Sequence, residues 1–319
     1  MPTGQGGGGN VPPMLIRCGG PPAAVAWDEF CGAFDSPHTR LTYRRAAERL
    51  LDWLAAEGVE LTAVSPGLVR RYLDGLRSGD TEHRPLSAAS LKVHAAAIRR
   101  LFDALVRRHA VMLNPALSLQ TPRVRRREGA TPDATPREAR ALLDSVTGDR
   151  PIDHRDRVAI GLLIYTGCRL GAVASLRLAD HQRGGDPEHL RLAEKGGQAR
   201  RIPVHPTLRE LLAAWRGVRG AAPGPLLPTV TARGTRLTDR PCSNADLHRM
   251  LKRRLAAAGL PGDLSAHSIR ACVATHLLDE GVPLESVQHL LGHADPGTTR
   301  LYDRRSRRTT PEVIERIRL

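Results

Sequence analysis

The stretch LSAHSIRACVATHLLDEG, residues 264–281, has the pattern of one short helix. Ser265 is a good N-cap, so His267 and Arg270 are expected in the first turn, on neighbouring faces. The core-facing stripe is expected to contain Ile269, Cys272, Val273, His276 and Leu277. His267 and Arg270 then lie outside the stripe. A helix N-terminus, an imidazole and a guanidinium fork suit an oxyanion, although H-x-x-R alone is a weak signal.

The stretch LLGHADPGTTRLYDRR, residues 290–305, follows after eight intervening residues. Asp295 and Pro296 are expected to begin a short helix. His293 precedes this helix, and Tyr302, one of four tyrosines in the chain, lies on it or at its end. Taken singly, His293 could be a hydrogen-bonded loop residue and Tyr302 a surface aromatic. Arginines surround Tyr302, so an anionic contact is the alternative.

Two basic residues upstream lie where predicted elements end. In YTGCRLGAVASLRLAD, Arg169 follows a helix that ends at Gly167, and a new helical run has Val173 and Leu176 on its inner side. In EHLRLAEKGGQARRIPVHP, apolar and polar residues alternate on both sides of a Gly-Gly turn, which predicts a β-hairpin. Lys195 lies at that turn. It is one of only three lysines among 48 basic residues, so its placement is a stronger signal than any single arginine.

Composition indicates a polyanionic partner. The 319-residue chain carries a formal net charge of +15, typical of proteins that bind nucleic acid. Its five cysteines are widely spaced without a C-x-x-C pair, so we expect neither a disulfide framework nor a metal site, and free thiols in the cytoplasm. No apolar run approaches the ~20 residues that span a membrane, so no membrane partner is expected.

Local patterns divide the chain into four parts. Residues 1–21 are rich in Gly and Pro and are expected to be disordered. Residues 22–112 are predicted to form a small helical domain. Residues 113–134 form a basic linker, and residues 135–319 form a mostly helical second domain with a small antiparallel sheet. The linker arginines, which either face solvent or follow a phosphate backbone, are Arg123, Arg125, Arg126 and Arg127.

Three helices are predicted in the first domain, at residues 39–58, 65–79 and 87–109. The second begins with Ser65 as its cap and a proline at its first position. The apolar stripe of the first helix is expected to contain Leu41, Leu50, Leu51, Trp53 and Leu54.

In combination, these features resemble the tyrosine recombinase (phage integrase) family. The order is an arginine, a lysine on a hairpin, H-x-x-R, G-H and a tyrosine, and the resemblance covers about residues 135–310 in detail. Residues 22–112 resemble the core-binding, SAM-like domain of that family more loosely. The resemblance implies an α+β fold that is mainly α with a small antiparallel sheet, comprising a helical core-binding domain and an integrase-type catalytic domain.

The resemblance also implies a catalytic set, which consists of Arg169, Lys195, His267, Arg270, His293 and Tyr302. Tyr302 would attack the scissile phosphate, and the two arginines would hold its non-bridging oxygens. The two histidines would support proton transfer and phosphate binding, and Lys195 would protonate the leaving 5′ oxygen. No cofactor or metal is expected, because the chain has neither a P-loop nor an acidic cluster of the kind that binds Mg²⁺.

Two positions depart from the family pattern. Many members carry an acidic residue three positions after the first arginine and a histidine directly after the second, where this chain has Ala172 and Ala271. Ala172 lacks the carboxylate that usually braces the site. Because the contact residues are all present, we expect a divergent subfamily with another brace.

The implied function is site-specific DNA recombination through a 3′-phosphotyrosine intermediate, performed in the cytoplasm by a homotetramer on synapsed double-stranded DNA sites. The alternatives are a type IB topoisomerase-like enzyme and a DNA-binding protein with a decayed recombinase site. The biological role stays open between integration of a phage or mobile element, transposition and chromosome dimer resolution.

Overall fold

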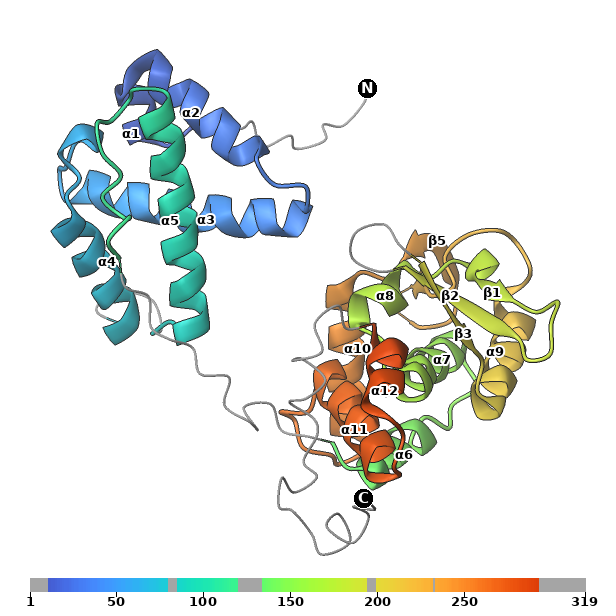
Figure 1. Cartoon of the computed structure of the whole chain (residues 1–319). Helices are drawn as coiled ribbons and strands as arrows, with labels where there is room; N and C mark the ends of the chain where they lie inside the picture. The colour runs from blue at the N-terminus through green and yellow to red at the C-terminus, as the bar shows by residue number, and fades with distance from the viewer. Residues whose placement is uncertain (1–10, 80–84, 120–133, 194–198, 232, 293–319) are drawn as a thin grey trace, which may run out of the picture. The chain divides into compact units, whose positions relative to one another are not determined.

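The computed structural model describes residues 11–79, 85–119, 134–193, 199–231 and 233–292. The chain divides into two compact units, Met1–Arg126 and Arg127–Leu319, and the elements of each can be followed in Figure 1. Both units are mainly helical, and both of the small antiparallel sheets belong to the second unit, so the predicted α+β fold class is confirmed. Within the described residues, no helix is long and apolar enough to cross a membrane.

The first unit is a bundle of helices. Its elements are α1 (Met14–Cys18), α2 (Gly20–Gly32), α3 (Pro37–Ala56), the 3-10 helix η1 (Leu61–Ala63), α4 (Pro66–Ser78) and α5 (Ala88–Arg107). Serine caps begin three of them, because Ser36, Ser65 and Ser87 each accept a hydrogen bond from a backbone N–H of the first turn. The three predicted helices therefore form close to where the sequence places them.

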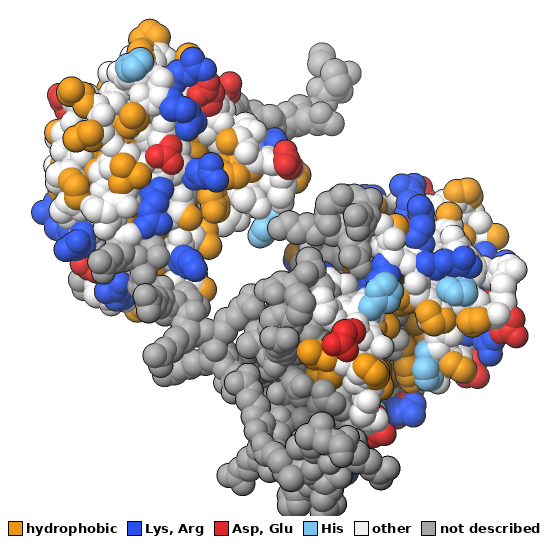
Figure 2. Space-filling view, viewed as in Figure 1, with side chains coloured by type: hydrophobic (Ala, Val, Ile, Leu, Met, Phe, Trp, Pro, Cys, Tyr) orange, Lys and Arg blue, Asp and Glu red, His pale blue; other side chains and the backbone are white. Residues whose placement is uncertain are grey.

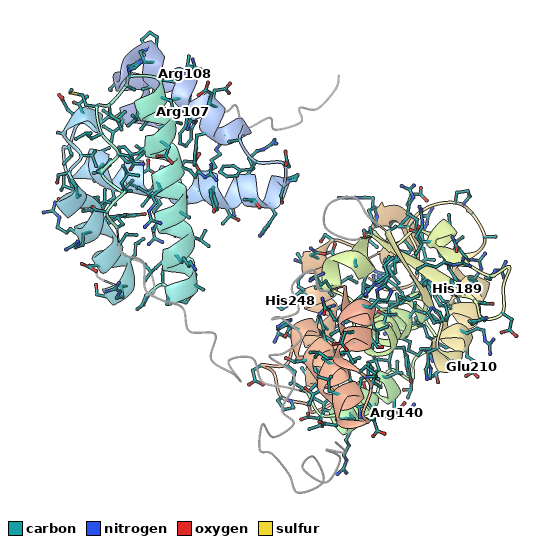
Figure 3. The ribbon with its side chains drawn as sticks, in the orientation of Figure 1. Arg107, Arg108, Arg140, His189, Glu210 and His248 are labelled. Atoms are coloured by element: carbon teal, nitrogen blue, oxygen red, sulfur yellow. The ribbon has the colours of Figure 1, made fainter. Side chains whose placement is uncertain are left out.

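The core of the first unit lies where α5 packs against α2 and α3, and α5 crosses α3 in Figure 1. Leu50, Leu51 and Leu54 are buried in it, as predicted. Leu41, predicted on the same stripe, is 46% exposed because it lies in the N-terminal turns of α3, which extend past the core. Arg107 and Arg108 lie at the C-terminal end of α5 (Figure 3). Arg108 forms an ion pair with Glu29 of α2.

Two predicted segments differ from the structure where it describes them. Residues 1–21 were expected to be disordered, but Met14–Cys18 is helical and buries Leu15 and Ile16 against the bundle. The predicted linker, residues 113–134, begins with chain that belongs to the first unit. Asn114 donates to the backbone carbonyl of Arg99 over 3.0 Å, and the following Ala116 is buried. Its arginines, residues 123–127, lie outside the described residues.

The second unit is built around α7. Its helices are α6 (Pro136–Asp144), α7 (Pro151–Thr166), α8 (Leu170–Ser175), the 3-10 helix η2 (Leu178–Asp180), α9 (Pro206–Arg219), α10 (Asn244–Ala257), α11 (Ala266–Asp279) and α12 (Leu284–Leu291). The helix α7 is buried along most of its length and contacts α6, α9, α10 and α11. Thr135 begins α6 as its N-cap and forms a reciprocal capping box with Glu138.

The predicted hairpin is present as β2 (His189–Ala193) and β3 (Ala199–Pro203), which pair antiparallel. The short strand β1 (His181–Gln182) extends this sheet in the order β1-β2-β3. Leu190 and Leu192 of β2 and Ile202 of β3 face the core, following the two-residue period of a strand. The turn that carries Lys195 lies outside the described residues. A second antiparallel pair, β4 (Pro228–Val230) and β5 (Leu237–Pro241), was not predicted.

Candidate active site

Arg270 lies in the second turn of α11, at the point where three helices meet. Ser265 caps this helix by accepting a hydrogen bond from the N–H of Ser268 at 3.2 Å, as predicted. The Arg270 side chain donates through Nη1 to the Gly167 carbonyl at 2.6 Å and through Nη2 to the Leu291 carbonyl at 2.7 Å. These carbonyls belong to the C-terminal ends of α7 and α12, where backbone acceptors lack intrahelical partners.

Arg270 is only 3% exposed, so the expectation that it lies outside the buried face of α11 is wrong. Its two carbonyl acceptors compensate the loss of water around the charge, which permits the burial. His276, expected in the core stripe, is exposed, and Ala274 and Leu278 are buried instead. The buried face includes positions 270, 274 and 278, which are four residues apart.

Arg169 also contacts the C-terminal end of α12. It is the N-cap residue of α8, directly after the α7 C-terminus, and its side chain is exposed. Its Nη1 donates to the Gly292 carbonyl at 3.1 Å. Arg169 and Arg270 therefore contact the carbonyls of consecutive residues, and two arginines separated by about a hundred positions in the sequence meet at one place.

His267 lies in the first turn of α11, at the surface, close enough to both arginines for their charges to act on it. Partial burial of the ring, followed by the charges of Arg270 and Arg169, holds its pKa below the ordinary value of 6.5. The imidazole is therefore neutral at neutral pH and can accept a proton. A neutral base beside two fixed cations is suited to the deprotonation of a hydroxyl that attacks an anion.

Gly167 makes this convergence possible. It ends α7 with a φ of 57°, in the left-handed region that favours glycine, and its carbonyl accepts from Arg270. A Cβ atom at this position would lie 2.7 Å from Cδ2 of Leu291 on α12. The two helices can approach this closely only because residue 167 has no side chain.

A third arginine at the α12 terminus was not predicted from the sequence. Arg200 of β3 donates through Nη1 to the carbonyls of His289 and Leu290. The strand period could have indicated it, because Arg200 lies on the same face of β3 as the buried Ile202. Figure 2 shows basic and histidine side chains lying near one another on the visible face of the second unit.

The structure thus brings together three of the six predicted catalytic residues, which are Arg169, His267 and Arg270. The other three, Lys195, His293 and Tyr302, lie outside the described residues, and their roles stay predictions. Within the described part of the chain, no group of three or more His, Cys, Asp or Glu residues could hold a metal ion.

Two family descriptions match the chain. Residues 133–308 match the "Phage integrase family", and residues 35–109 match "Phage integrase, N-terminal SAM-like domain". Among curated relatives, "Tyrosine recombinase XerC" of Vibrio campbellii is 32% identical over 276 residues, which cover 84% of this chain and 82% of the relative. "Tyrosine recombinase XerD" of Corynebacterium glutamicum is 31% identical over 278 residues and is covered to 87%.

Solved structures share the fold at lower identity. A lambda integrase dimer bound to a COC′ core site superposes with a TM-score of 0.65 at 18% identity, covering 95% of this chain and 84% of that one. The XerH site-specific recombinase bound to its difH substrate gives a TM-score of 0.64 at 19% identity, covering 86% and 77%. The extent of the family match and the identity to the curated relatives show that the chain belongs to the phage integrase family, as a tyrosine recombinase.

Proposed function

We propose that this protein cleaves and rejoins double-stranded DNA at specific sites through a 3′-phosphotyrosine intermediate. The observation that carries the proposal is the convergence of Arg169, Arg270 and His267 on one helix terminus, in the order and spacing of the family motif. Two guanidinium groups and a neutral imidazole match the needs of phosphoryl transfer. The arginines bind the non-bridging oxygens, and the imidazole accepts the proton of the nucleophile.

Electrostatics explain why this chemistry needs fixed arginines. A phosphodiester is an anion that repels nucleophiles, and in-line attack builds further charge on its non-bridging oxygens. Arginine stays charged at any useful pH and can donate to two oxygens at once. Arg270 is held in place by its carbonyl acceptors before DNA binds, so little of its ordering remains to be done in the transition state.

Tyr302 is the proposed nucleophile, and the three tyrosines in the described residues support this by their packing. Tyr72 is buried, which raises the pKa of its phenol above the ordinary value and makes the phenolate costly. Tyr43 packs edge-on against Phe34, with ring centroids 4.7 Å apart. Tyr165 stacks on His205 at 4.3 Å.

The other two predicted residues complete the mechanism. His293 follows Gly292, whose carbonyl accepts from Arg169, so it is close in sequence to the arginine cluster. Lys195 lies on the hairpin whose strand β3 carries Arg200. We assign proton donation to the leaving 5′ oxygen to Lys195, and support of the phosphate to His293.

The phosphotyrosine bond retains the energy of the phosphodiester, so another 5′-hydroxyl can reverse the step without ATP. Cleavage is expected to persist in excess EDTA.

The partner is proposed to be duplex DNA bound by four copies of the chain. Support comes from the net charge of +15 and from a fold shared with a lambda integrase tetramer bound to a Holliday junction, with a TM-score of 0.66 at 17% identity. We also propose a cytoplasmic location for this activity on DNA. The arginines of residues 123–127 are proposed to follow the phosphate backbone between the two domains.

The test is to trap and map the covalent adduct. DNA that is covalently bound to the protein is recovered from cells, and sequencing of its ends defines the cleavage site. A substrate nicked near that site then accumulates adduct, and mass spectrometry of the digested adduct identifies the modified residue. We expect Tyr302 to be modified, and Tyr302→Phe to bind DNA without forming adduct, whereas the control Tyr165→Phe forms it. Attachment at any other residue contradicts the proposal.

Two further observations separate the proposal from its alternatives. Relaxation of supercoiled DNA that lacks the mapped site would identify a topoisomerase-like enzyme. A wild-type chain that binds DNA but yields no covalent adduct from cells would identify a DNA-binding protein with a decayed site.

A further inference from the structure

The C-terminus of α12 collects arginine side chains from three other elements. Arg200 of β3 donates to the carbonyls of His289 and Leu290. Arg270 and Arg169 donate to the next two carbonyls along the chain. The carbonyls at a helix C-terminus lack intrahelical partners and carry the negative end of the helix dipole, so cations there stabilise the helix end.

Two of these arginines belong to the predicted phosphate-binding pair, and Arg200 has no assigned part in that chemistry. Its side chain is partly buried and lies on the inner face of β3. Burial raises the pKa of the Cys168 thiol, and the charges of both Arg270 and Arg200 oppose that rise. The two guanidinium groups therefore lie close to the same buried thiol, and Arg200 belongs to the same cluster as Arg270.

We infer that Arg200 is a positioning residue of the active site, which holds the last turn of α12 against β3 and so fixes the point from which the chain continues to His293 and Tyr302. The inference rests on the proposed function, because it gives those two residues their roles. Arg200 acts through the backbone of α12 and does not touch the phosphate. Hydrogen bonds from a charged donor are among the stronger ones in proteins, so two of them can hold a helix end in place.

The neighbouring residue provides a matched control. Arg201 is exposed on the opposite face of β3, and its Nη2 lies 3.3 Å from Nδ1 of His189, which Figure 3 labels on the sheet. Arg200→Ala and Arg201→Ala remove the same charge from adjacent positions, so their effects on nonspecific DNA affinity should be equal. A difference between them in the rate of cleavage then reports the contact with α12.

The first measurement is the single-turnover rate of adduct formation on the nicked substrate at saturating DNA. Arg200→Ala should slow it by about 10- to 100-fold, as expected when charged hydrogen bonds are removed. Arg201→Ala should stay within about threefold of wild type, as for a surface substitution. Arg200→Lys keeps the charge and one donor group, so it should recover part of the rate, and it replaces the alanine variant if that variant does not fold. Equal rates for Arg200→Ala and Arg201→Ala overturn the inference.

A second substrate tests which part of the site Arg200 serves. A bridging sulfur at the 5′ position of the scissile phosphate leaves without protonation, so it should restore cleavage by Lys195→Ala. It should not restore Arg200→Ala, whose defect lies in the placement of the chain after α12. Full restoration of Arg200→Ala would show that this arginine serves Lys195 and its hairpin, and would overturn the inference.

Hydrogen exchange gives a reading that does not depend on recombination. Without DNA, Arg200→Ala should speed exchange of the backbone amides at residues 290–292, while Arg201→Ala leaves them as in wild type. If the wild-type chain forms no adduct on its mapped site, the proposed function fails, and the exchange data alone still decide the contact. Unchanged exchange in Arg200→Ala would show that Arg200 does not hold the helix end.

Discussion

Two groups of arginines in the second unit are held by different acceptors. At the α12 terminus, the acceptors described for the arginines are backbone carbonyls. Between α7 and α10, the acceptors are two buried carboxylates, Asp153 and Asp156. Arg254 donates to both, at 2.6 Å and 2.8 Å, and Arg253 reaches Asp156 at 2.8 Å. The first group meets partial charges, and the second meets full ones.

The kind of acceptor determines how much of an arginine's charge remains available to a further ligand. A carboxylate cancels the charge of its partner, whereas a carbonyl orients a guanidinium and leaves its net charge in place. Burial alone would raise the pKa of Asp153, but hydrogen bonds from Arg254 and Arg150 outweigh it and hold this pKa below 3.8. That group is a charge-paired cross-link between α7 and α10. The carbonyl contacts do not themselves cancel the charge of the other group, which suits the phosphate binding proposed for Arg169 and Arg270.

The largest effect is on stability, and it is expected from Asp156→Ala, in the cluster of arginines and carboxylates between α7 and α10. Its side chain is 0% exposed and pairs with Arg155, Arg253 and Arg254. Removing it leaves buried positive charge uncompensated, which should lower the free energy of unfolding by about 3–5 kcal/mol. Urea denaturation followed by circular dichroism measures the decrease. Asp149→Ala, at a 97% exposed carboxylate, is the control and should change little. A decrease as small as the control's would mean that the cluster does not hold α7 to α10.

The next largest effect is on the rate of adduct formation, and it is expected from Arg169→Gln, in the cluster of arginines held by backbone carbonyls. Removing one preorganised donor to a reacting phosphate should slow adduct formation by about 10²- to 10³-fold. The melting temperature should stay close to wild type, because Arg169 is exposed and its described acceptor is one carbonyl. Arg191→Gln is the control, since Arg191 pairs with Asp180 at 2.8 Å and its charge is already cancelled. Similar rates for the two variants would mean that Arg169 does not act on the reacting phosphate.

A smaller effect is expected from pH, through His267. Because its pKa lies below 6.5, the imidazole stays neutral at neutral pH and gains a proton only as the pH falls further. If it is the proton acceptor, kcat/KM for adduct formation should be constant near neutrality and decline below pH 6.5, by up to about tenfold per pH unit. His267→Gln should abolish this acidic limb. A rate that rises on acidification would show that the protonated form acts, as a phosphate ligand.

The smallest effect concerns a third group of arginines, outside the described residues. If Arg125, Arg126 and Arg127 bind phosphates, replacing all three with alanine should flatten the dependence of log affinity on log salt by about 0.9 for each phosphate that is no longer bound. Fluorescence anisotropy of labelled DNA at several salt concentrations measures the slope. An unchanged slope would place these arginines in solvent.

Much of the fold could be predicted because its signals are local. Caps at Ser65, Thr135 and Ser265 and the glycine after α7 mark helix ends through contacts within a few residues. The pair β4–β5 was missed because strands as short as Pro228–Val230 show little alternation. The helix at Met14–Cys18 was missed because the surrounding Gly and Pro dominate the composition, while two buried apolar residues attach it to the bundle.

The sequence identified residues of the site, but it did not predict how deeply they are buried or which groups they contact. Arg169, His267 and Arg270 were identified from their motif, and the structure brings them together. The burial of Arg270 could not be predicted, because its acceptors are backbone carbonyls 103 and 21 positions away, and every residue has a carbonyl. The strand period could have placed Arg200 on the inner face of β3, but its acceptors are also backbone carbonyls, which the sequence does not mark. Sequence patterns identify side chains that meet each other more readily than side chains that meet the backbone.

Gly167 shows what this means for mutational tolerance. Its carbonyl accepts a hydrogen bond from Arg270, and its lack of a side chain leaves room for Leu291. It therefore has no functional group by which a search for catalytic residues would find it. Any side chain there meets both a left-handed backbone, which costs about 1–2 kcal/mol, and a neighbouring helix at contact distance. In a saturation mutagenesis experiment scored by recombination, position 167 should therefore behave like the catalytic residues, although it has no group that could react.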